Sequence, residues 1–163
     1  MPASAAPGMY IDGLNIMSLI KETGLGLAAI LLVTIFHGFF SKHILLQGER
    51  SIHGHASSRK INVIAIKFYL SILALVLVHV GEILLWAFSL ELFDLTDNLL
   101  NALLVAGSTY TTVGFEADSL KPGWKFYPVF IAVSGLFNFA WSTSTMMTLL
   151  TQAREALKAK AKA

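Results

Sequence analysis

Residues 111–116, which read TTVGFE, combine hydroxyl groups, a glycine and a carboxylate in a stretch that could bind an ion. Leucines recur at helical spacing over residues 99–110, and Thr96, Asp97 and Asn98 are helix N-cap residues just before them. If this short helix ends inside a membrane, the non-helical backbone after it must be buried in protein or line water. The negative end of the helix dipole then favours a cation. We therefore predict that residues 111–116 line a pathway for a monovalent cation.

Glu82 is a second candidate, because it lies in an apolar stretch with His79 three residues before it and Trp86 four residues after it. A carboxylate within a membrane is costly to bury unpaired and is a functional candidate by default. We expect Glu82 to bond to the short helix or to a histidine and to hold residues 111–116 from behind. Proton coupling through Glu82 is the alternative.

The five histidines are candidate metal ligands: His37, His43, His53, His55 and His79. No cysteine accompanies them. His53 and His55 could form a weak surface site, but Gly54, Ser57 and Ser58 around them indicate a flexible loop. We expect no metal site other than the monovalent cation, and no organic cofactor.

The composition indicates a membrane protein. The chain has 163 residues, of which 55% are hydrophobic and 13% charged, and its mean hydropathy is +0.67. The absence of cysteine excludes disulfides and thiolate metal sites, and a net charge of +2 is too small to indicate nucleic acid as a partner. Membrane lipids are the expected surroundings.

Three stretches have the roughly 20 apolar residues that cross a hydrocarbon core of about 30 Å. The fold class is therefore an all-α membrane protein with three transmembrane helices and one re-entrant helix. We divide the chain into an extracytoplasmic N-terminal segment, 1–22; a first transmembrane helix, 23–46; a cytoplasmic loop, 47–60; a module of residues 61–153; and a basic cytoplasmic tail, 154–163. The module comprises an outer helix at about 62–93, the re-entrant helix at about 98–110, residues 111–116 and an inner helix at about 125–153.

Basic residues indicate the orientation. If the loop 47–60 is cytoplasmic, every Lys and Arg except Lys21, Lys121 and Lys125 falls on the inner side. The N-terminus is then outside and the C-terminus cytoplasmic. Acidic residues gather on the outer side, where a mouth would concentrate cations.

Four motifs follow in order: HVGEILLWA at 79–87, STYTTVGF at 108–115, LKPGWK at 120–125 and SGLFNFAWSTS at 134–144. Together they resemble the small bacterial three-span members of the two-transmembrane, or pore-domain, potassium and ion channel family, over nearly the whole chain. The resemblance implies a homotetramer in the bacterial inner (plasma) membrane, with residues 98–110 as the pore helix. It further implies a filter in which carbonyls of four residues replace the hydration shell of a potassium ion, namely Thr112, Val113, Gly114 and Phe115. The residues expected to support this filter are Thr111, His79, Glu82 and Trp86.

The chain departs from the family's pattern after Phe115. Glu116 stands where the family has a glycine, and a side chain in that backbone conformation costs about 1 to 3 kcal/mol. Ala117 replaces an aspartate, and Asp118 falls one position late, so the filter mouth formed by Glu116 and Asp118 is remodelled. Phe115 for the usual tyrosine is a milder change, since one hydroxyl bond is lost. In the inner helix, Gly135 would allow a bend or close helix packing.

We expect electrodiffusion of potassium or another monovalent cation, not catalysis, so the chain is not predicted to be an enzyme. The first alternative is a non-conducting structural or accessory subunit of a larger membrane complex that retains the channel fold. The second is a weakly selective cation channel in which four Glu116 carboxylates form a ring. No voltage sensor is expected, because the first span lacks repeated arginines.

Overall fold

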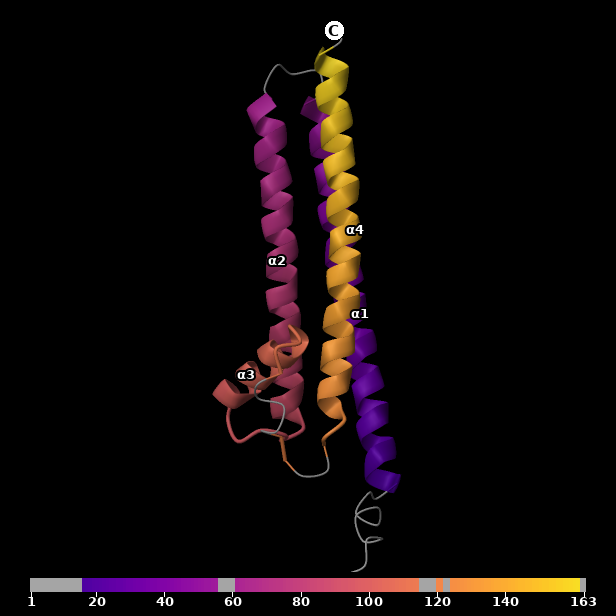
Figure 1. The fold of residues 1–163 in the computed structure, drawn as a ribbon, viewed down its shortest axis with the longest axis vertical. Coiled ribbons are helices and arrows are strands. Elements are labelled where there is room, and N and C mark those ends of the chain that lie inside the picture. Colours follow the sequence, from indigo (N-terminus) through magenta and orange to yellow (C-terminus); the bar gives the residue numbers. More distant parts are fainter. Residues whose placement is uncertain (1–15, 56–60, 115–119, 122–123, 162–163) are drawn as a thin grey trace, which may run out of the picture.

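The computed structural model describes residues 16–55, 61–114, 120–121 and 124–161. Within these ranges it contains four helices and no strand: α1 (Ile16–His55), α2 (Ile61–Leu92), α3 (Leu99–Tyr110) and α4 (Tyr127–Ala161). The three long helices stand side by side, with α2 antiparallel to α1 and α4, and the short α3 lies beside one end of α2 (Figure 1). α1 packs against α2 and α4, and α3 packs against the same two helices. The prediction of an all-α fold is confirmed.

Three helices are long and apolar enough to cross a membrane, over Leu19–Ser51, Ile64–Leu92 and Tyr127–Lys158. Large apolar side chains cover their outward faces; Leu31 of α1 and Phe88 of α2, for example, are more than half exposed. A bilayer would bring lipid tails against these faces. The 12 residues of α3 are too few to cross.

The helix ends differ in part from the predicted ones. α2 and α3 begin and end within one residue of the predicted 62–93 and 98–110. α1, however, continues through His55, so residues 47–55 are helical although the sequence predicts a loop there. α4 continues to Ala161, so the basic tail is helical up to that residue, as predicted. Polar residues such as Gln47 and Glu49 are good helix formers, so a drop in hydropathy marks the edge of a membrane span and not the end of a helix.

The largest buried core lies where α3 meets α2 and α4. Its biggest side chains are Trp86, Tyr110 and Tyr127, each 0% exposed. The rings of Trp86 and Tyr127 pack edge to face, with centroids 5.8 Å apart. Ala102, Val105 and Ala106 form the buried face of α3 in this core. The core therefore holds the short helix against two membrane spans.

Both flanks of α3 are tied down. The side-chain oxygen of Asn98 accepts a hydrogen bond from the amide of Asn101 at 2.9 Å, which caps the helix. Beyond the segment that follows α3, the Lys121 amide donates to the Leu95 carbonyl at 3.1 Å, and the Lys121 ammonium lies 2.7 Å from the Asp94 carboxylate. The chain thus leaves α3 and returns to the turn that precedes it.

Candidate functional site

Helix α3 ends between two membrane spans. The hydroxyl of its last residue, Tyr110, donates a hydrogen bond to Glu82 of α2, and the Tyr110 carbonyl lies against Gly135 of α4. Glu82 and Gly135 both belong to helices that can cross a membrane. The non-helical backbone that starts at Thr111 therefore lies at the depth of these spans, where it needs protein or water around it.

The segment after α3 turns back on the end of the helix. The amide and hydroxyl of Thr111 both donate to the Gly107 carbonyl, at 3.1 and 2.8 Å. The amides of Val113 and Gly114 both donate to the Ser108 carbonyl, at 2.8 and 3.0 Å. These bonds satisfy carbonyls at the end of α3 and fix the path of the chain through Gly114.

The predicted filter residues lie partly within this segment. Thr111, Thr112, Val113 and Gly114 are all exposed on the single chain. Thr112 has a φ of 62° and Gly114 a φ of 72°, both left-handed. The predicted filter residue Phe115 and the predicted mouth residues Glu116 and Asp118 lie outside the described residues.

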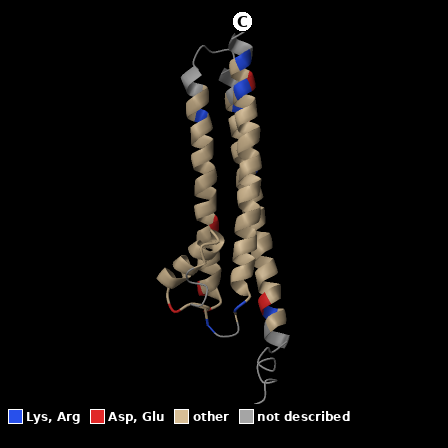
Figure 2. Ribbon diagram, in the orientation of Figure 1, with Lys and Arg blue, Asp and Glu red and all other residues tan. Residues whose placement is uncertain are grey.

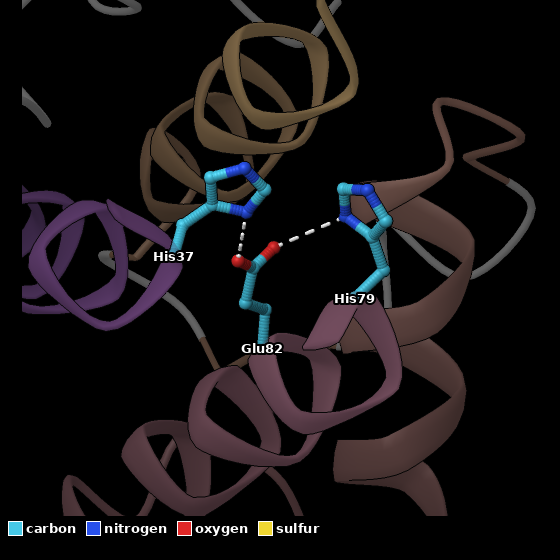
Figure 3. A group of neighbouring side chains, drawn as sticks. All are labelled: His37, His79 and Glu82. Carbon is cyan, nitrogen blue, oxygen red and sulfur yellow. Dashed lines mark hydrogen bonds and ion pairs between the residues drawn. The ribbon is translucent and has the colours of Figure 1, made fainter. Parts of the chain in front are cut away.

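Tyr110 contacts a buried polar cluster, of which Figure 3 shows His37, His79 and Glu82. Glu82, which is 0% exposed, faces the Nδ1 atoms of two imidazoles: that of His37 at 2.6 Å and that of His79 at 3.2 Å. Glu82 also accepts a hydrogen bond from the hydroxyl of Tyr110. The sequence predicts a bond from Glu82 to the short helix or to a histidine, and the structure contains both.

The fourth helix joins the cluster through Ser142. Its hydroxyl lies 2.9 Å from Nε2 of His79 and 3.5 Å from Nε2 of His37. The imidazole of His79 also stacks on Phe139, with ring centroids 4.4 Å apart. Side chains from α1, α2 and α3 therefore meet at one carboxylate, and α4 contacts the two imidazoles through Ser142.

Sequence reasoning missed three members of this cluster: His37, Tyr110 and Ser142. The available signal for His37 was an imidazole within the charge-free residues 23–41 of the first span. Its partner could not be identified in that way, because His37 and Glu82 are 45 positions apart. Tyr110 lacked any comparable signal, since a tyrosine next to polar residues is common at helix ends.

Trp86 and Gly135 occupy positions around the same core. The indole N–H of Trp86 donates to Ser134 of α4 at 2.9 Å, so its hydrogen bond links the two spans and does not reach α3. A Cβ on Gly135 would overlap the Tyr110 carbonyl. Of the two roles expected for Gly135, the structure contains the close packing.

Three comparisons with known proteins give no match, whether among protein-family models, curated proteins or solved structures. Function therefore has to be inferred from the site itself.

Proposed function

We propose that the chain is a potassium-channel-like pore protein that conducts a monovalent cation passively through a tetrameric filter. The ligands would be the backbone carbonyls of Thr112, Val113, Gly114 and Phe115. The observation that carries the proposal is the backbone of the segment after α3: Thr112 and Gly114 have positive φ angles, of 62° and 72°, and Val113 between them does not. Such a backbone is neither helical nor extended, and it supports the proposal of a filter loop whose carbonyls would serve as ligands.

The proposal requires more than one chain. A single copy leaves Thr111 to Gly114 exposed at the depth of the membrane spans, where bare backbone needs protein or a water-filled pathway around it. A closed ring of four copies would surround these segments with protein and would leave a water-filled pathway along the common axis that they face. Apolar side chains on α4, such as Leu136 and Phe137, are more than half exposed and offer a surface for neighbouring copies.

Electrostatics favour a cation at this position. The C-terminal end of α3 directs its partial negative charge toward the segment 111–114. Lys and Arg residues are concentrated at the end of the bundle that holds the C-terminus (Figure 2). By the positive-inside rule we place this end in the cytoplasm of a bacterial cell and the N-terminus outside the inner membrane.

Flux from liposomes tests the proposal. Purified protein is reconstituted with separate gradients of potassium, sodium and calcium, and ion release is compared with that from empty vesicles. Potassium flux well above sodium flux supports the proposal. Absence of flux for every ion would contradict it and favour the non-conducting subunit, whereas calcium permeation would favour the channel with a Glu116 ring.

A substitution at Glu116 separates backbone strain from charge. Glu116→Gly is expected to raise the potassium-to-sodium ratio, because glycine adopts left-handed backbone without a steric cost. Glu116→Gln is the matched control, since it removes the charge and keeps the side chain. If both variants have wild-type selectivity, position 116 does not shape the filter.

Particle symmetry gives an independent test. In lipid nanodiscs the particles should have fourfold symmetry, because each chain contributes one filter segment and the proposed filter needs four. A protein that remains a monomer or dimer in lipid would exclude a fourfold pore.

A further inference from the structure

The cluster behind α3 has the donor atoms of a metal centre. His37, His79 and Glu82 each offer one ligand atom, and these atoms lie within 4.8 Å of one another. The three residues are 0%, 8% and 0% exposed. Tyr110, also 0% exposed, adds a phenolic oxygen 2.8 Å from Nδ1 of His79. The set is two imidazole nitrogens, one carboxylate and one phenol, all types that bind zinc-like ions.

The spacing suits a four-coordinate ion. With bonds of about 2.0 to 2.1 Å, neighbouring ligand atoms around a tetrahedral zinc ion lie about 3.3 Å apart. Nδ1 of His37 is 2.6 Å from Oε1 of Glu82, and Nδ1 of His79 is 3.2 Å from Oε2 of Glu82 and 2.8 Å from the Tyr110 hydroxyl. These three separations have to widen by less than about 1 Å to admit the ion. The Tyr110 hydroxyl and Oε2 of Glu82 lie closer together and have to move further apart.

Ser142 contacts both imidazoles. The ionised Glu82 carboxylate only accepts hydrogen bonds, so a neutral His37 presents a protonated Nδ1 to it and a bare Nε2 to the Ser142 hydroxyl. Nε2 of His79 lies against the same hydroxyl, while Nδ1 of His79 has both Glu82 and the Tyr110 hydroxyl as neighbours. An ion held by both Nδ1 atoms moves the ring protons to Nε2. The Ser142 oxygen can then accept from both rings.

From the donor set, its spacing and the position of Ser142 we infer that His37, His79, Glu82 and Tyr110 bind one divalent transition-metal ion of the zinc class, with Ser142 orienting the two imidazoles. The ion would join α1, α2 and α3 next to the point where the chain leaves α3. This inference does not depend on whether the chain conducts ions. The rival explanation is a network of hydrogen bonds among the same side chains that holds no metal.

Cobalt and zinc titrations distinguish the two. Protein purified without a histidine tag is placed in nanodiscs, treated with a chelator and titrated with Co²⁺. We expect about one equivalent per chain, with the intense visible absorption of four-coordinate Co²⁺ and displacement of Co²⁺ by Zn²⁺. No stoichiometric binding, or only the weak spectrum of a six-coordinate ion, would overturn the inference and leave the metal-free network as the explanation.

Variants locate the site. His37→Gln and His79→Gln should abolish stoichiometric binding, and Tyr110→Phe should weaken it. Ser142→Ala leaves all four ligands in place and should lower the affinity about 10- to 100-fold. If a ligand variant fails to fold, the wild-type spectrum and the Ser142→Ala titration still decide the question.

Two controls use histidines outside the cluster. His43→Gln changes an exposed histidine of α1, whose ring packs on Phe39, and should leave the titration unchanged. The double variant His53→Gln/His55→Gln removes the candidate surface site. Loss of binding in either control, with binding retained in His37→Gln, would refute the site proposed here. All these readouts are measured without ion flux, so they stand apart from the test of conduction.

Discussion

Tyr110 is held from two sides. Its hydroxyl bonds to Glu82, and its carbonyl lies against the bare backbone of Gly135. The ring between them is fully buried and tilted against Phe139 at 5.5 Å. The direction in which the chain enters Thr111 is therefore set by contacts with α2 and α4, and not by α3 alone.

Gly135→Ala should weaken this arrangement, because the added methyl group would overlap the Tyr110 carbonyl. Overpacking of this kind costs about 1 to 3 kcal/mol. We expect a lower melting temperature in nanodiscs and altered ion flux in liposomes, since the residue before the predicted filter has to shift.

Gly24→Ala is the matched control for that substitution. Gly24 lies in α1, and a Cβ there would meet no atom within 4 Å. Alanine is the better helix former, so this variant should be as stable as the wild type or slightly more so. Equal destabilisation by the two substitutions would show that the contact at Gly135 is unimportant.

At the scale of elements, α3 is the part of the fold that depends most on its surroundings. Isolated helices of 12 residues are marginal in water, and α3 is stabilised by a buried face, an N-cap and hydrogen bonds at its C-terminal end. Leu99 and Leu100 on its other side are more than half exposed. In the proposed tetramer this side would meet lipid or a neighbouring copy.

Asn98→Ala should loosen α3, because the amide of Asn101 loses the side-chain acceptor that lies 2.9 Å away. Loss of such a cap costs about 1 kcal/mol. Hydrogen exchange of the first-turn amides of α3 should become several-fold faster, while exchange in the middle of α2 should not change.

Asn98→Asp keeps an acceptor oxygen at the same position and should preserve slow exchange. If Asn98→Ala exchanges at the wild-type rate, the buried face alone holds α3 in place.

At the scale of the whole molecule, the three long helices and the distribution of charge make the orientation testable. The chain has no cysteine, so a single introduced cysteine is labelled without background. Lys125 and Lys158 are both exposed and lie near opposite ends of α4. They therefore report on the two sides of the membrane through one helix.

In intact cells, Lys125→Cys should react with a membrane-impermeant maleimide, whereas Lys158→Cys should react only after permeabilisation. This labelling pattern is expected because the excess of Lys and Arg at the C-terminal end of α4 places that end in the cytoplasm. The opposite pattern would invert the proposed topology, and labelling of both sites in intact cells would show that α4 does not cross the membrane.

Features that depend on local sequence were predictable. Hydropathy identified the three long helices, and the residues before Leu99 together with the leucine spacing placed α3 to within one residue. The spacing of His79 and Glu82 placed both on one face of α2. Even here, hydropathy placed the end of the first helix too early. Polar residues mark the edge of a membrane span, but the helix can continue through them. The filter mouth, at Glu116 and Asp118, stays a prediction.

The tertiary structure decided which distant residues meet. His37 lies 45 positions from Glu82, and Tyr110 lies 28 positions from it, yet both contact its carboxylate. Whether such residues touch depends on the rotation and depth of each helix against its neighbours. These are settled by packing, here by Gly135 against Tyr110 and by the buried aromatic core. Hydropathy and helical periodicity report the environment of one helix at a time, so they predicted the helices. Only the packing of the helices could bring side chains from α1 and α3 to a carboxylate of α2.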